Sequence, residues 1–162
     1  MSSIASAFAT YAQMPAQQDE TLNVIKITKL ALDIFNEGYI YFTSEKNEVI
    51  IKFDRTQLMR VITNLVKNSI QAIHENHLEE PKIEVRVYQD ESFAIISVMD
   101  NGTGITDENK AMVFEPKFTT KTSGMGLGLA MVKKIVETYG GEISFKTIKG
   151  EGTTFIVKLP LK

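Results

Sequence analysis

Cysteine is missing from this chain, which excludes a disulfide framework and a thiolate metal site and is compatible with a reducing compartment. Long apolar runs are missing as well: none approaches the roughly 18 residues that a membrane span needs. The first residues, Met1-Ser2-Ser3, lack the basic region that opens a signal peptide. We therefore expect a soluble chain.

An excess of positive charge is also absent. The formal net charge is -2 and there is no long basic run, whereas non-specific nucleic-acid binding needs clustered lysine and arginine. We therefore expect no nucleic-acid partner. What the chain does have is 162 residues with 43% hydrophobic content, which suffices for a single core. One domain with a short appendage is the expected organisation.

The appendage lies at the start of the chain. Ile4, Phe8 and Tyr11 share one helical stripe, and Pro15 opens a segment that interrupts it. This pattern is typical either of a frayed tail or of a dimerisation helix that has been cut short. The predicted parts are the end of that helix with a linker, residues 1–20, and one domain, residues 21–162.

Apolar spacing predicts strands and helices in the remainder. The polar residues from Asp54 to Gln57 have a capping-box pattern that opens a long helix, and Gly140-Gly141 ends a later one. Helices together with antiparallel strands indicate an α+β fold in two layers. The predicted strands are residues 21–27, 39–42, 48–53, 83–88, 93–99, 142–147 and 153–159, and the predicted helices are residues 29–35, a long one from Asp54, and 127–139.

Two asparagines stand one turn apart on the long predicted helix. Asn64 and Asn68 therefore project from the same face. They either cap neighbouring loops or offer oxygen to magnesium, which binds one or two protein groups and keeps phosphates and waters around it. Between them, Lys67 is either a phosphate contact or a solvated surface lysine.

Three glycine clusters follow the asparagines. The first begins at Asp100, where Gly102 and Gly104 allow the backbone to approach a flat ring closely. The second opens a helix, whose amides at its start form an anion site together with Lys121. The third contains Thr153 on the closing hairpin. Residues 106–124, between the first two clusters, are predicted to form a mobile lid.

The order of these four segments resembles the N box and the three glycine boxes of the Bergerat-fold ATP-binding superfamily. That superfamily contains sensor histidine kinases, gyrase and heat-shock chaperone ATPases, and mitochondrial dehydrogenase kinases. Residues 114–121 are similar to the F box of the histidine kinases, and the first residues are similar to the linker helix of the nitrogen-regulation type. The resemblance implies a two-layer sandwich of a mixed, mostly antiparallel sheet with helices on one face.

The resemblance also implies roles for individual residues. Asn68 would ligate Mg²⁺, and the carboxylate of Asp100 would accept from the exocyclic amine of adenine and so favour ATP over GTP. Thr153 would share a water with Asp100 and the purine. Asn64 and Asn68 are the implied catalytic residues. The implied nucleotide-binding residues are Lys67, Asn68, Asp100, Gly102, Gly104, Lys121, Gly124, Gly126, Leu127, Gly128 and Thr153.

Several positions depart from related patterns. Asn64 stands where the gyrase and chaperone branch has a glutamate that activates water, and an amide cannot act as that base. Histidine kinases often have a basic residue at Gln71, and Lys117 replaces a residue that is usually aromatic. We interpret His74 and His77 as surface residues, because no third metal ligand is in evidence and no long acceptor helix flanks them.

The expected function is that of the ATP-binding catalytic domain of a two-component sensor histidine kinase. Its cofactors would be ATP and Mg²⁺. Its partners would be the dimerisation and phosphoacceptor domain of the same kinase, a homodimer at full length, and a response regulator. The domain would be cytoplasmic, with any membrane anchor in other parts of the protein. An ATPase switch of the gyrase class and a pseudokinase that only senses ATP are the alternatives.

Overall fold

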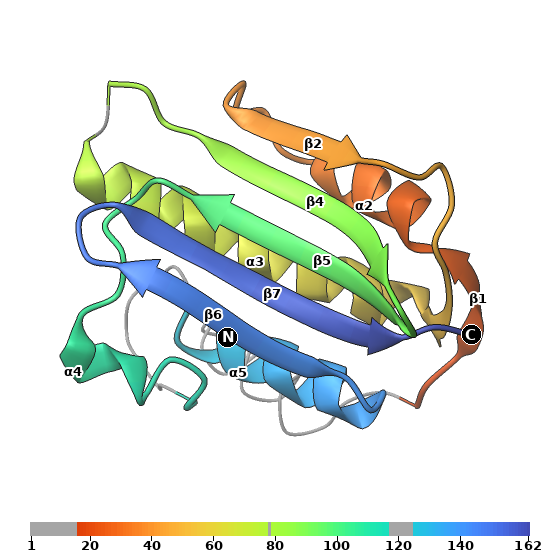
Figure 1. Ribbon diagram of the computed structural model, residues 1–162. Coiled ribbons are helices and arrows are strands. Elements are labelled where there is room, and N and C mark those ends of the chain that lie inside the picture. Colours follow the sequence, from red (N-terminus) through yellow and green to blue (C-terminus); the bar gives the residue numbers. More distant parts are fainter. Residues whose placement is uncertain (1–15, 78, 117–124) are drawn as a thin grey trace, which may run out of the picture.

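A five-stranded sheet with helices packed on one face forms the body of the protein (Figure 1). The computed structural model describes residues 16–77, 79–116 and 125–162. The strand order is β2-β4-β5-β7-β6, with β2 and β4 parallel and the other neighbours antiparallel. The strands are β2 (Ile40–Ser44), β4 (Ile83–Asp90), β5 (Phe93–Asp100), β6 (Glu142–Ile148) and β7 (Gly152–Pro160).

Within the described residues, three helices form the second layer, so the predicted α+β fold with a mixed, mostly antiparallel sheet is confirmed (Figure 1). They are α2 (Val24–Leu32), α3 (Arg55–Asn76) and α5 (Met125–Thr138). A single turn, α4 (Asp107–Lys110), precedes the residues that are not described. Among the described helices, none combines the length and the apolarity needed to cross a membrane.

Helix α3 begins where the capping pattern predicted. The Oδ1 atom of Asp54 accepts a hydrogen bond from the Gln57 amide at 3.0 Å, which satisfies one of the free donors of the first turn. The helix ends at His77, whose φ of 47° is left-handed. Its apolar stripe is fully buried and comprises Leu58, Val61, Ile62, Leu65 and Val66.

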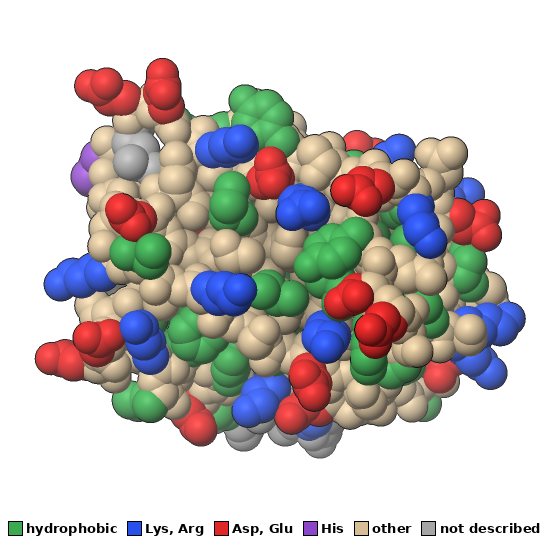
Figure 2. All heavy atoms as spheres, viewed as in Figure 1, with side chains coloured by type: hydrophobic (Ala, Val, Ile, Leu, Met, Phe, Trp, Pro, Cys, Tyr) green, Lys and Arg blue, Asp and Glu red, His purple; other side chains and the backbone are tan. Residues whose placement is uncertain are grey.

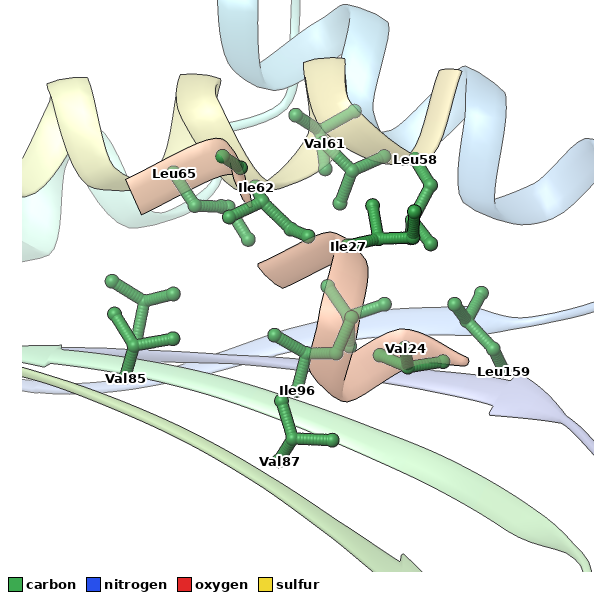
Figure 3. Packing of buried hydrophobic residues seen from close by; sticks show 14 of the residues in the cluster. Val24, Ile27, Leu58, Val61, Ile62, Leu65, Val85, Val87, Ile96 and Leu159 are labelled. Atoms are coloured by element: carbon green, nitrogen blue, oxygen red, sulfur yellow. The ribbon is translucent and has the colours of Figure 1, made fainter. Parts of the chain in front are cut away.

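The core lies between this stripe and the inner face of the sheet (Figure 3). Val85, Val87, Ile96 and Leu159 point from the strands toward the helices and are almost completely buried. Burial of each such side chain contributes about 1.5–3 kcal/mol. Alternate residues of the same strands face outward. Figure 2 shows acidic and basic side chains interspersed over that outer face.

The strand predicted for residues 21–27 is wrong in its second half. Strand β1 (Asp19–Asn23) ends at Asn23, and α2 begins at Val24. The β-branched run there favours a strand locally. However, the Asn23 side chain accepts from the amides of Ile25 and Val49, each at 3.1 Å, and so caps the helix and anchors the neighbouring loop. Tertiary contacts override the local preference.

A second, smaller sheet stands beside the first. Strand β1 pairs antiparallel with β3 (Ile50–Asp54), with Asp19 opposite Asp54 and Asn23 opposite Ile50. Strands β2 and β3 are neighbours in the sequence but belong to different sheets. The chain therefore enters the domain through β1, alongside the strand that leads directly into α3. The proposed division at residue 20 remains a prediction.

Candidate functional site

The two asparagines of α3 lie where the helix meets the start of α5. Asn64 and Asn68 are half-buried, whereas Lys67 is exposed. A Cβ atom added to Gly128 would lie 3.4 Å from the Asn64 Oδ1 atom, so α5 packs directly beside this asparagine. Neither asparagine side chain forms a hydrogen bond within the described ranges.

Asp100 occupies the end of β5, at the edge of the same region. It is only 3% exposed, and it lies opposite Thr153 of β7 in the sheet register. Its Oδ1 atom accepts a hydrogen bond from the Gly102 amide at 2.9 Å. Its Oδ2 atom is buried and has no hydrogen-bond partner among the described residues. A buried acceptor without a donor is costly, which makes this oxygen the feature of the site that most calls for a ligand.

Burial raises the pKa of Asp100, because the charged carboxylate is removed from water. The backbone amides of Gly102 and Thr153 lower the pKa and offset part of this effect. The Ser69 hydroxyl on α3 also lowers it, although it forms no hydrogen bond of good geometry. The buried carboxylate is thus incompletely satisfied by the described residues.

The loop after Asp100 is pressed against α3. A Cβ atom on Gly102 would lie 2.6 Å from the Ala72 carbonyl carbon, so a larger residue cannot be placed there without a shift of the backbone. The Thr103 amide donates to the Ala72 carbonyl oxygen at 3.3 Å. Gly104 has a φ of 75°, which favours glycine, and approaches the Ile148 carbonyl. The loop is therefore held between the helix and the β6–β7 hairpin.

Thr153 takes part in a small hydroxyl network that the sequence did not reveal. Its Oγ1 atom lies 2.8 Å from that of Thr147, and the Thr147 Oγ1 atom accepts from the Ile105 amide at 2.8 Å. The only local signal for Thr147 is its position opposite Thr153 in the β6–β7 register. This network joins the hairpin to the loop that follows Asp100.

The structure describes only part of the region that is predicted to bind the phosphates. Gly126, Leu127 and Gly128 lie in the first turns of α5, as the predicted anion site requires. Lys121 and Gly124 lie outside the described residues, as does the rest of the segment 117–124, which contains the last part of the predicted lid and most of the F box. At the start of the F box, the Phe114 ring is half-buried against the core and packs edge-on against Phe145 and Phe155, with ring centroids 5.8 and 6.3 Å away.

His74 and His77 lie at the end of α3, and both are exposed, as predicted. In the described part of the chain, no group of three or more histidine, aspartate or glutamate side chains could hold a metal ion. Gln71 donates to the Glu75 side chain at 3.4 Å on the same helix. The role of Asn68 as the metal ligand stays a prediction.

Known proteins with similar sequences include sensor histidine kinases. The chain is 33% identical, over 98% of its length, to a protein of Rickettsia conorii named an NtrY-like sensor histidine kinase, and it spans 27% of that protein. It is 39% identical, over 77% of its length, to the sensor histidine kinase ZraS of Escherichia coli K12, of which the match covers 26%. The chain thus spans about a quarter of the length of these relatives.

Solved structures with a similar fold also include a histidine kinase. The catalytic domain of the histidine kinase ThkA, in a nucleotide-free form, superposes with a TM-score of 0.76 at 30% identity, covering 90% of this chain and 97% of that domain. A structure of ThkA in complex with the response regulator TrrA gives a TM-score of 0.80 at 26% identity, covering 98% of this chain and 46% of ThkA.

The fold and the site define an ATP-binding domain of the Bergerat type. A sequence profile of the family described as histidine kinase-, DNA gyrase B-, and HSP90-like ATPase matches residues 53–162, which include α3 and the three glycine clusters. The chain belongs to this family, and within it the similar proteins are sensor histidine kinases.

Proposed function

We propose that the domain binds ATP with the adenine ring against Asp100. The observation that carries this proposal is the buried Oδ2 atom of Asp100, which has no hydrogen-bond partner in the part of the chain that the structure describes. The exocyclic amine of adenine would donate to it, whereas guanine would bring a carbonyl oxygen to the same place and leave two acceptors facing each other. A Cβ atom on Gly102 would lie 2.6 Å from the Ala72 carbonyl carbon, so glycine at this position lets the loop after Asp100 lie close to α3.

The phosphates would lie between α3 and the start of α5. The backbone amides of Gly126, Leu127 and Gly128 would bind them at the helix N-terminus, with Gly124 and Lys121 completing the cradle. Asn68 would give its side-chain oxygen to Mg²⁺, which prefers oxygen ligands and, when bound, neutralises charge on the phosphates. The remainder of the proposed nucleotide site would be lined by Gly104, Lys67 and Thr153.

The proposed reaction is transfer of the γ-phosphoryl group to a histidine on a separate dimerisation domain. Phosphoryl transfer depends mainly on positioning and electrostatic stabilisation, which such a cradle supplies. Asn64 packs beside the start of α5 and would help to position the phosphates. Its amide cannot activate water as a base, so hydrolysis should be slow and transfer should depend on the acceptor.

The proposed partners follow from the same family. They are the dimerisation and phosphoacceptor domain of the same kinase, which would be a homodimer at full length, and a response regulator. The complex of ThkA with TrrA supports the latter by similarity. In the complete protein the domain would be cytoplasmic and attached to a membrane-anchored sensor.

The test uses ATP labelled on its γ-phosphate, this chain and the acceptor-helix domain of its parent kinase. We expect label on the acceptor domain, little free phosphate, and no stable label on the chain itself. His74→Ala and His77→Ala variants serve as controls and should behave as the unmodified chain does. Binding of Mg-ATP without transfer would indicate a pseudokinase, and steady hydrolysis without an acceptor would favour an ATPase switch.

A further inference from the structure

Tyr139 directly follows α5, at a junction where three distant parts of the chain meet. Its ring stacks on Phe53 of β3, with centroids 3.7 Å apart. Its hydroxyl accepts a hydrogen bond from the Asp54 amide at 3.0 Å and donates to the Asp19 Oδ1 atom at 2.5 Å. One side chain thus joins the end of α5, the start of α3 and the segment through which the chain enters the domain.

Asp54 makes further hydrogen bonds at this junction, to the start of α3 and to the residue before Asp19. Its Oδ1 atom caps α3, and its Oδ2 atom accepts from the Gln18 amide at 2.8 Å. Burial alone would raise the pKa of Asp54, but amides at Gln18, Gln57 and Thr56, with the charge of Arg60, lower it. The carboxylate therefore stays charged and holds the entry segment at neutral pH. We call Gln18, Asp19, Asp54 and Tyr139 the entry latch.

The entry latch lies at the far ends of the two helices that form the floor of the nucleotide site. Along α3, Asn64 lies about 15 Å from the cap at Asp54, and along α5, Gly128 lies about 16 Å from Tyr139. The helices touch at both places, because Gly128 packs beside Asn64 and Tyr139 contacts Asp54. The pair is thus joined at the site and again at the latch.

The end of α5 cannot move independently of the sheet. A Cβ atom on Gly141 would lie 2.3 Å from the Lys158 carbonyl oxygen, so the turn after Tyr139 is pressed against β7. Packed helices move as rigid units and shift between discrete arrangements, since close-packed cores do not deform continuously. Because the far end of α5 is held against β7, a change in packing at its glycine-rich start would be borne by the contacts that hold the helix, among them the hydrogen bonds of the Tyr139 hydroxyl.

We propose that the entry latch couples occupancy of the nucleotide site to the segment at residues 16–23, with α5 as the connector and Tyr139 as the positioning residue. The coupling rests on the proposed ATP site. Nucleotide at the start of α5 strengthens the latch and slows opening of residues 16–23. In a longer kinase, the latch would set the direction in which the preceding polypeptide leaves the domain.

The experiment is amide hydrogen exchange of residues 16–23, with and without Mg²⁺ and a non-hydrolysable ATP analogue, while calorimetry records binding. The analogue should slow exchange there by about fivefold, a typical coupling between two sites. Tyr139→Phe keeps the ring on Phe53 but removes both hydrogen bonds, and should abolish the slowing. Asp19→Ala, an exposed position, should do the same without risk to the fold.

Tyr88→Phe on β4 is the matched control and should respond as the unmodified chain does. Because coupling is reciprocal, the two latch variants should also bind the analogue about fivefold more weakly. Binding without any change in exchange at residues 16–23, or an unaltered response in Tyr139→Phe and Asp19→Ala, would overturn the coupling alone. Absence of binding would overturn the proposed ATP site and the coupling with it.

Discussion

Replacing Asp100 by asparagine should stabilise the free domain and at the same time weaken its binding of ATP. The substitution preserves the size of the side chain, and its oxygen can still accept the hydrogen bond that the Gly102 amide donates at 2.9 Å. It removes a charge that is 3% exposed and whose second oxygen has no partner among the described residues. The two effects have opposite signs because the Oδ2 atom destabilises the free domain, in which no described residue donates to it. In the ATP complex, the same atom would accept a hydrogen bond from adenine.

The gain in stability and the loss of affinity can each be estimated from the surroundings of Asp100 without and with ATP. An unsatisfied buried polar group costs about 1–3 kcal/mol, and the new amide group recovers only part of this, so we expect a gain of about 1 kcal/mol. For a chain of this size, that corresponds to a melting temperature about 2–4 °C higher. Loss of a hydrogen bond to a charged acceptor costs about 1.5–3 kcal/mol, which weakens ATP and ADP alike by about 10- to 150-fold.

Thermal unfolding and calorimetry at several pH values test the argument. Because burial raises the pKa of Asp100 in the folded state, its protonated form is stabilising. That contribution is complete below the ordinary pKa near 4 and is lost as the pH rises through the raised value. The advantage of Asp100→Asn should therefore be largest at neutral pH and shrink in acid. An equal or lower melting temperature at pH 7, or unchanged ATP affinity, would refute the reasoning.

Three other substitutions probe the remaining contacts. Gly102→Ala should destabilise the domain by about 1–3 kcal/mol in chemical denaturation, because its Cβ atom would lie 2.6 Å from backbone of Ala72. Asn68→Ala should leave the melting temperature nearly unchanged while calorimetry shows that nucleotide binding no longer depends on magnesium; a retained dependence would assign Asn68 a structural role only. Asp54→Ala should cost about 1–2 kcal/mol at pH 7, as loss of a helix cap does. Since the pKa of Asp54 is lowered, its contribution disappears as the pH falls below about 4, and denaturation curves for the two proteins should converge there.

The sequence predicted the elements whose signals are local. The cap at Asp54 and the apolar stripe that follows it placed α3 correctly, and the one-turn spacing of Asn64 and Asn68 placed both on one face of the helix. The order of the four boxes was enough to indicate the family. These features depend on periodicity, residue order and short-range hydrogen bonds, and all of them can be read along the chain.

Other features depend on residues far apart in the sequence and became visible only in the folded chain. Residues 24–27 have a strand-like composition but are helical, and the Asn23 side chain that caps them also binds the amide of the distant Val49. The Tyr139 hydroxyl donates to Asp19, 120 residues away in the sequence, and no local pattern indicates that contact.

In the candidate site, too, some features can be read from the sequence and others only from the folded chain. The sequence by itself determined which residues could bind a nucleotide, because residue type and order set the chemistry of Asp100 and the glycine clusters. Only the tertiary structure decided that one oxygen of Asp100 is buried without a partner among the described residues, and that Thr147 joins Thr153 behind it. Burial and hydrogen-bond satisfaction are properties of the packed whole, since neighbours from α3, β5 and β7 together exclude water from that oxygen.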